Sequence, residues 1–245
     1  MGWIDDLKVK TAELVQSAVL NCKASAAEVN ADAHGQSLSA WRTKHVGLAV
    51  AAAGGNLIGG PVAFAALAIE IPALLNIMSR ASLGIGTITT GAASDDDYEA
   101  ILAVWAGAVA LDGDLLAATR AHLAGGAAAA AGSNLGGALA SSLAGSAGTK
   151  AIAKAAVSLN TQMLSSAVAA IVGKKLMLKG GSKLIASKIA AKIVASLPTR
   201  FMPIVGAAVA GTINAWFLNS LMDAAERYYG FLGEAAGSAP ELLPA

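Results

Sequence analysis

The stretch GGNLIGGPVAFAALAIEIPALLNIMSR, residues 54–80, decides the fold prediction for the whole chain. It is almost wholly apolar and begins with glycines, and its one acid, Glu70, precedes Pro72 by two residues. An acid at a bilayer centre costs about 2.5–3.5 kcal/mol, and an unpaired acid in a protein core costs several kcal/mol. The stretch therefore predicts a long apolar helix, bent at Pro72, that contains a polar group in need of a partner.

Two interpretations of Glu70 remain open at this point. In the structural one, a basic side chain pairs with Glu70 and holds the bundle in register; the candidates are Arg80, the next charge along the chain, Lys44 and Arg200. In the functional one, Glu70 is a polar site in an apolar cavity, for a lipid headgroup or a proton-linked contact.

Composition indicates close helix packing or contact with a membrane. Of the 245 residues, 56% are hydrophobic and 13% are charged, against about 25% charged in an ordinary soluble domain. The single cysteine, Cys22, allows no internal disulfide, which is consistent with a reducing compartment. Asp5 and Asp6 lie where a signal peptide needs positive charge, so we expect a cytoplasmic protein without an export signal.

Charge is distributed unevenly although the net charge is only +1. Residues 121–222 contain nine cations and no Asp or Glu. Such asymmetry indicates either an anionic partner surface or complementary packing between the halves of the chain. Each cation near an anionic leaflet contributes about 1 kcal/mol, although the same lysines could simply solvate one face of a bundle. The membrane-surface candidates are Lys174, Lys175, Lys179, Lys183, Lys188 and Lys192.

Apolar periodicity predicts an all-α protein, a single bundle of seven to nine helices, with no strand pattern. We expect one domain over residues 1–236 and a disordered tail over 237–245. Residues 25–36 are predicted to be a break between helices, and residues 84–92 a loop. Asp96 and Glu99 have the spacing of a capping box. The main expected helices span 3–24, 37–53, 61–84, 95–111, 114–124, 150–172, 182–195 and, as more than one helix, 203–234.

Residues 125–148 are nearly all Ala, Gly, Ser and Leu, with a small residue at every fourth position from 132 to 148. Such a ridge lets two helices approach closely, as in membrane helix pairs. The same composition also describes a flexible linker, and glycine carries a helix penalty of about 1 kcal/mol. Both interpretations stay open.

Three uncharged runs, 46–69, 121–149 and 201–222, are long enough to span a bilayer. Their composition favours buried core helices, because the first contains Asn56 with six Gly or Pro residues and the last contains Asn214 and Asn219. A compact bundle that docks on a membrane is our preferred prediction. Integral insertion and a purely soluble bundle are the alternatives.

The sequence shows little sign of catalytic or metal chemistry. His34, His45 and His122 are scattered and Cys22 has no partner cysteine, so we expect no metal site and no cofactor. The basic residues lack interleaved aromatics, which disfavours nucleic-acid binding. The three acids at 95–97 are typical of a helix start rather than of a cation site.

Four motifs in order resemble the EcsC family: GGNLIGG, AIEIPALLNIMSR, SDDDYEAILAVWAGA and LPTRFMPIVGAAVAGTINAWFLNSLMDAAERYY. Together they cover most of residues 40–232. The resemblance implies a bacterial, helical, uncharacterised protein, with some members encoded beside an ABC transporter. This chain departs from the pattern in its unusually repetitive Ala/Gly tract, and its central acid is Glu where Asp is expected nearly as often. The motif positions carried over are Glu70, Pro72, Arg80, Gly206 and Asn214.

The sequence thus leads to three functional hypotheses. The first is a non-enzymatic, membrane-associated bundle that binds lipid at an anionic surface or assists a membrane transporter, on the inner face of the membrane. The second is a pore-forming or membrane-inserting protein whose hairpins open into lipid. The third and weakest is a hydrolase acting on a lipid, with Glu70 as the base.

Overall fold

The computed structural model describes residues 9–10, 13–15, 17–18, 21–53, 62–119, 165–172, 185, 187, 189–191 and 205–235. Every regular element within these residues is helical, so the predicted all-α class is confirmed. Residues 113–119 and 165–172 are helical as well. The Ala/Gly tract and the C-terminal tail lie outside the described residues. The bounded helices are α2 (Ala26–Ala33), α3 (Leu38–Ala53), α4 (Val62–Thr90), α5 (Asp97–Trp105) and α10 (Val205–Ala235).

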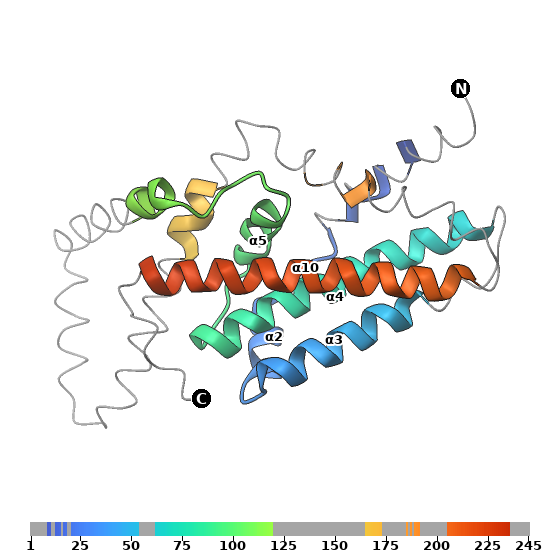
Figure 1. Cartoon of the computed structure of the whole chain (residues 1–245), viewed down its shortest axis with the longest axis horizontal. Coiled ribbons are helices and arrows are strands. Elements are labelled where there is room, and N and C mark those ends of the chain that lie inside the picture. The colour runs from blue at the N-terminus through green and yellow to red at the C-terminus, as the bar shows by residue number, and fades with distance from the viewer. Residues whose placement is uncertain are drawn as a thin grey trace.

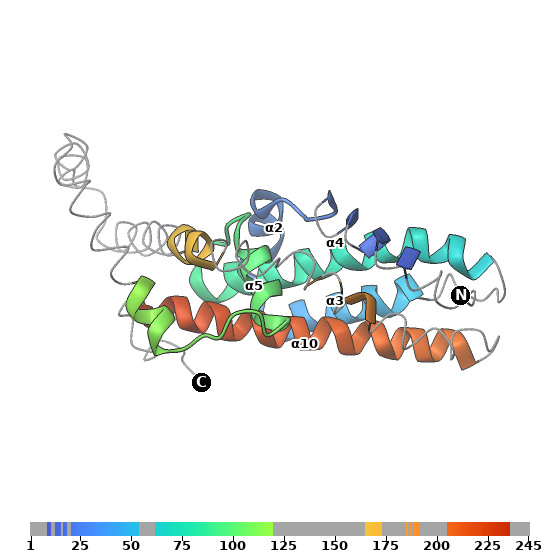
Figure 2. The ribbon, with the colours of Figure 1, turned by 90° about the horizontal axis from the view of Figure 1, so that it is seen from above.

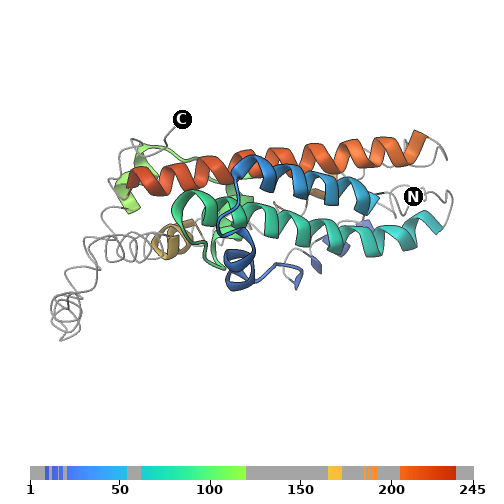
Figure 3. The same cartoon turned by 90° about the horizontal axis from the view of Figure 1, so that it is seen from below.

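Three long helices, α3, α4 and α10, lie side by side and form the core of the bundle (Figure 1). Helix α10 packs against both α3 and α4, and α3 packs against α4. In Figures 2 and 3 the C-terminus of α3 and the N-termini of α4 and α10 lie at the same end of the bundle. Helix α4 is therefore antiparallel to α3 and parallel to α10. The shorter α2 packs on α4, and α5 packs mainly on α10.

The predicted loop over residues 84–92 is wrong, because α4 continues as a helix to Thr90. Its glycines permit close packing rather than a turn. A Cβ atom on Gly84 would lie 2.2 Å from the indole of Trp41, and one on Gly86 would lie 2.2 Å from the ring of Tyr229. Both rings are buried, so these two glycines set how closely α3 and α10 approach α4.

The threonines that follow these glycines also belong to the helix. The Thr89 hydroxyl donates to the Ile85 carbonyl at 2.7 Å, and the Thr90 hydroxyl donates to the Gly86 carbonyl at 2.8 Å. Both bonds return to the carbonyl four residues earlier, as threonine does inside helices. The helix ends at Thr90, and the next residue, Gly91, has a φ of +90°, in the left-handed region that glycine adopts without strain.

The predicted break over residues 25–36 is also wrong, because it contains α2. The Ala26 amide at the start of α2 donates to Asp95 Oδ1 at 2.7 Å, so a distant carboxylate caps this helix. At the other side, Arg80 of α4 forms ion pairs with Glu28 and Asp32 of α2. These contacts with α4 and with the turn before α5 hold an eight-residue helix that is too short to be stable alone.

Helix α5 differs from its prediction at both ends. Asp96 stands at the N-cap but makes no side-chain capping bond, so the expected capping box is not formed. The helix ends at Trp105 rather than near residue 111, and Gly107 with φ +68° follows it. The closing segment is one continuous helix, α10, rather than several. The expected helix at 37–53 is confirmed as α3.

Replacing Gly84 by Ala tests the close approach of α3 and α4. The new methyl group would overlap the buried Trp41 ring, and overpacking of this kind costs about 1–3 kcal/mol. We expect Gly84→Ala to lower the free energy of unfolding, although alanine is preferred to glycine inside helices by about 1 kcal/mol. Urea unfolding measures the effect, and each 1 kcal/mol should appear as about 2–4 °C in Tm.

Gly47→Ala in α3 is the matched control. Gly47 is exposed and no atom lies within 4 Å of a Cβ built on it, so only the helix-propensity gain applies. We expect this variant to be stabilised by about 0.5–1 kcal/mol. Equal effects of the two substitutions would contradict the packing argument.

Candidate functional site

Glu70 lies inside the bundle at the point where α3, α4 and α10 meet. The Asn214 side chain of α10 donates from Nδ2 to Glu70 Oε1 at 3.1 Å and to the carbonyl oxygen of Ala49 in α3 at 3.2 Å. Asn214 is fully buried and Glu70 is only 5% exposed. We refer to the Glu70 and Asn214 side chains as the Glu70–Asn214 pair. One amide therefore links all three core helices through hydrogen bonds.

The predicted Glu70–Arg80 ion pair is wrong. Both residues lie on α4, and ten residues at 1.5 Å per residue place them about 15 Å apart along the helix axis. Arg80 pairs with Glu28 and Asp32 of α2 instead. Lys44 is not the partner of Glu70 either, because its ammonium group lies over the Trp41 ring, 5.1 Å from the centroid. Arg200 is outside the described residues.

The structure also places Pro72 and Gly206, two other positions of the sequence motifs. Pro72 is half-buried within the continuous α4, two residues after Glu70. Gly206 lies in the first turn of α10. The six candidate lysines lie outside the described residues, so their membrane-surface role stays a prediction; they are Lys174, Lys175, Lys179, Lys183, Lys188 and Lys192.

Large apolar side chains lie on the outside of the bundle near the level of the Glu70–Asn214 pair. Each of them lies within two residues of Ala49, Glu70 or Asn214 along its own helix, and hence within about 3 Å of the same level. Their exposed fractions are unusually high for side chains of this size. We call this set the apolar ring: Leu48 at 46% exposure, Val50 at 43%, Ile69 at 76% and Trp216 at 50%.

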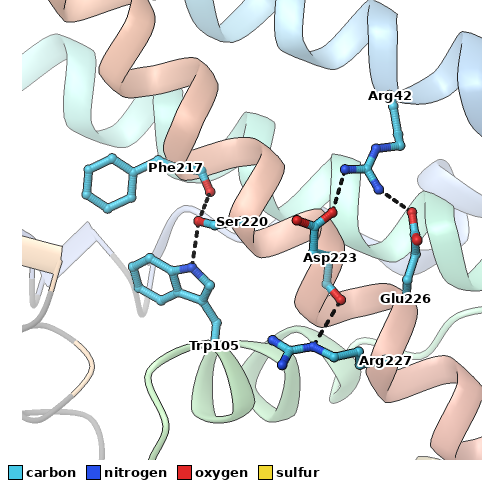
Figure 4. Close-up of polar contacts among 7 residues, drawn as sticks. All are labelled: Arg42, Trp105, Phe217, Ser220, Asp223, Glu226 and Arg227. Atoms are coloured by element: carbon cyan, nitrogen blue, oxygen red, sulfur yellow. Dashed lines mark hydrogen bonds and ion pairs between the residues drawn. The ribbon is translucent and has the colours of Figure 1, made fainter.

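Charged side chains begin farther along the bundle. Arg42 of α3 donates to Glu226 and, at 2.6 Å, to Asp223 of α10 (Figure 4). Burial lowers the pKa of Arg42, but its two carboxylate partners more than offset this and leave the pKa raised. Between this ion-pair network and the described end of α10 at Val205, the helix contains no ionisable side chain. That segment is about 27 Å long.

The end of the bundle away from the apolar ring contains a buried carboxylate that the sequence did not indicate. Asp97 Oδ1 accepts hydrogen bonds from the hydroxyls of Ser165 and, at 2.9 Å, Tyr228. Asp97 Oδ2 accepts from the Tyr229 hydroxyl at 3.1 Å and from the Ser94 amide at 2.8 Å. Asp97 was expected among three acids at a helix start, and composition alone does not separate the buried acid from its exposed neighbours.

Burial dominates the electrostatics of this cluster. It raises the pKa of Asp97, and the hydrogen bonds from Ser165, Ser94, Tyr228 and Tyr229 offset the shift only in part. Burial also raises the pKa of both tyrosines, and the Asp97 charge raises them further. All four donors satisfy the carboxylate, so the cluster joins α5, α10 and residues 165–172 as a structural contact.

His45 is a second buried titratable group, in α3 against Trp41. Its Nδ1 lies 2.9 Å from the Trp41 carbonyl oxygen, and the two ring centroids are 4.1 Å apart. Burial lowers the pKa of His45; the Trp41 carbonyl raises it, and the charges of Lys44 and Arg80 lower it. His45 is therefore neutral in the folded protein near pH 7.

We also searched the described residues for metal-binding clusters and for cavities. Within the part of the chain that the structure describes, no group of three His, Cys, Asp or Glu side chains is placed to hold a metal ion. A cavity of about 270 Å³ lies between α5 and residues 165–172. Its polar lining comes from Asp96, Glu99 and Ser166, and Glu99 is 3.6 Å from the Lys23 ammonium.

The uncharged runs that are long enough to span a bilayer do not coincide with the helices that the structure describes. Run 46–69 is shared between α3 and α4, so it cannot form one span. Among the described residues, one helical segment, Ile69–Thr90, is long and apolar enough to cross a bilayer. Within its most apolar window, 67% of residues are buried inside the bundle, as in the core helix of a soluble protein. Length and composition are thus weak evidence for a span.

Comparisons with known proteins give no relative: the chain matches no protein-family model, no curated protein and no solved structure. The EcsC resemblance therefore depends on its sequence motifs.

Replacing Asp97 by Asn tests the buried carboxylate. The pKa of Asp97 is raised in the fold above its ordinary value of 3.8, so its contribution to stability is fully present below that value and is lost as the pH rises through the folded pKa. Asn does not titrate. We expect the free energy of unfolding of Asp97→Asn, relative to the unsubstituted protein, to increase as the pH rises from 4 toward the raised pKa.

Urea unfolding at a series of pH values provides the measurement. His45 contributes with the opposite sign, because its lowered pKa gives stability that is lost as the pH falls below its ordinary value of 6.5. This contribution is common to both proteins and cancels in their difference. A difference that does not vary with pH would contradict the raised pKa of Asp97.

Proposed function

We propose that this protein is a non-enzymatic, membrane-associated helical bundle of EcsC type, which docks on a lipid bilayer through the apolar ring. The carrying observation is the position of the ring at a level of the bundle where the outer faces of the three core helices, α3, α4 and α10, carry no charged side chain. Exposed apolar patches of this kind mark interaction sites in soluble proteins. The proposed ligand is membrane lipid.

The distribution of acids supports this orientation. Helix α5 and the segments beside it contain exposed acids, and they pack near the C-terminal half of α10, away from the ring; these acids are Asp95, Asp96, Glu99, Asp112 and Asp114. An anionic membrane surface repels such a cluster, so the acidic end faces the cytoplasm when the ring faces lipid.

Two contributions to membrane binding are expected. Transfer of the exposed part of each ring side chain into hydrocarbon is worth about 1–2 kcal/mol and does not depend on salt. The six lysines between residues 174 and 192 add attraction to anionic lipid, which salt screens. We place the protein at the inner face of the cytoplasmic membrane on this basis, and a membrane transporter is the partner that the family resemblance suggests.

The weaker hydrolase hypothesis receives no support from the position of Glu70. A general base must come within hydrogen-bond reach of the proton that it removes. Glu70 is 5% exposed and accepts a hydrogen bond from Asn214 in the closed bundle. A lipid substrate would therefore have to separate α4 from α10 to reach this carboxylate.

Substitutions in the apolar ring test docking directly. Ile69→Ser removes the most exposed ring side chain, and we expect its affinity for neutral phosphatidylcholine vesicles to fall about tenfold, which corresponds to about 1.4 kcal/mol. Ala51→Asp places a charge on the exposed face of α3 beside the ring and should weaken binding more. Flotation of vesicles in a density gradient gives both affinities.

Ala118→Asp is the matched control for Ala51→Asp. Ala118 is exposed in the helical residues 113–119, next to the acidic end, so the same change should leave flotation unaltered. Docking through the ring is disproved if the two aspartate variants bind equally well, or if the unsubstituted protein does not float with vesicles of any composition.

Replacing the six lysines by Gln tests the electrostatic contribution. We expect binding to vesicles that contain phosphatidylglycerol to fall more than tenfold at low salt, since each surface cation contributes about 1 kcal/mol. Binding to neutral vesicles should stay unchanged. The six positions are Lys174, Lys175, Lys179, Lys183, Lys188 and Lys192. The control replaces Lys8, Lys10 and Lys23 by Gln instead. The lysine prediction fails if the six-fold variant binds anionic vesicles as tightly as the unsubstituted protein.

A further inference from the structure

At one level of the bundle, two polar side chains lie inside while large apolar side chains lie outside. The buried interior holds a carboxylate and a carboxamide, and the exterior at the same level exposes Ile69 and Trp216. Soluble bundles usually place apolar groups inside and polar groups outside. Polar side chains that face the bundle interior, with apolar ones outside, are the arrangement found within membranes.

Lipid changes what holds helices together at this level. In water, burial of apolar surface keeps α3, α4 and α10 associated. In hydrocarbon that contribution disappears, because lipid tails are as apolar as the side chains, and close packing and interhelical hydrogen bonds remain. At this level, Asn214 makes hydrogen bonds to both neighbouring helices.

We infer that Asn214, through its bonds to Glu70 and Ala49, keeps the ring end of the bundle closed while that end is in lipid. This inference rests on the proposed docking function. When the pair is intact, the protein docks without opening. When it is broken, the α3–α4 hairpin separates from α10 and disturbs the bilayer.

The Asn214 amide is satisfied on its donor side only. Asn214 Oδ1 is buried and, among the described residues, accepts no hydrogen bond. A buried acceptor without a donor destabilises the fold relative to an apolar side chain of similar shape. Leucine at position 214 would remove this unpaired acceptor, but it would also take a donor from the buried Glu70 carboxylate and so lower stability in water.

The test compares two Asn→Leu substitutions in α10. Asn214→Leu removes both interhelical bonds. Asn219→Leu makes the same chemical change five residues later, at a half-buried position for which no hydrogen bond is seen among the described residues. We expect Asn214→Leu to release a fluorescent dye from phosphatidylcholine vesicles about tenfold faster than the unsubstituted protein, and Asn219→Leu to match the unsubstituted protein.

Flotation and urea unfolding separate the outcomes. All three proteins should float with vesicles and be folded in water, and Asn214→Leu should unfold at the lowest urea concentration because Glu70 loses a donor. Absence of flotation for the unsubstituted protein defeats the docking proposal itself. Flotation with equal leakage for both leucine variants leaves docking intact and overturns the role of Asn214, as does an Asn214→Leu variant that is unfolded in water.

A disulfide provides a second, independent measurement. A Cβ built on Gly211 would lie 3.9 Å from the Cα of Val50, which suits a disulfide between α10 and α3. In an Asn214→Leu, Cys22→Ser background, the Val50→Cys, Gly211→Cys pair should abolish the extra leakage when oxidised and restore it when reduced. Because Val50 belongs to the apolar ring, flotation of the oxidised and reduced forms is compared, and the two should bind vesicles equally. Leakage that does not respond to reduction overturns the opening step.

Discussion

The packing of Trp41 against Gly84 is the contact on which the other helix positions depend. Trp41 is fully buried, and its indole N–H donates to the Ala81 carbonyl at 3.0 Å, so both the ring and its polar atom are satisfied by α4. Tyr229 packs against Gly86 in the same way from α10. Two aromatic rings on two glycines thus fix both neighbours of α4, because interiors packed to this density do not tolerate an added methyl group without strain.

Once these helices are fixed, the two ends of the bundle have different interiors and different surfaces. Near α5, the buried Asp97 receives four hydrogen bonds and the nearby surface is charged. Around Asn214, the interior hydrogen bonds are fewer and the surface is apolar. The first end is arranged for contact with water. The docking and closure proposals both concern the second end.

The helical class and the bounds of α3 could be predicted because apolar periodicity and low strand propensity are local properties of the sequence. The errors fell where distant contacts decide. Residues 84–90 are a loop by composition, yet Trp41 and Tyr229 make them helical. Residues 26–33 are too polar and short to predict a helix, yet Arg80 and Asp95 hold them. Asp97 could not be separated from Asp95 and Asp96 without knowing that two tyrosines of α10 face it.

Glu70 and Arg80 lie in one helix but do not form an ion pair with each other. Because about 15 Å of continuous helix separates them, the two side chains serve different neighbours: Arg80 pairs with the acids of α2, and Glu70 accepts from Asn214 of α10. The long apolar helix is thus tied at two levels to two partners. A substitution at Arg80 should act through α2 and leave the ring end of the bundle unchanged, whereas one at Glu70 or Asn214 acts at the level of the apolar ring. The motif therefore describes two separate interhelical contacts, and only the one around Asn214 lies at the level of the apolar ring.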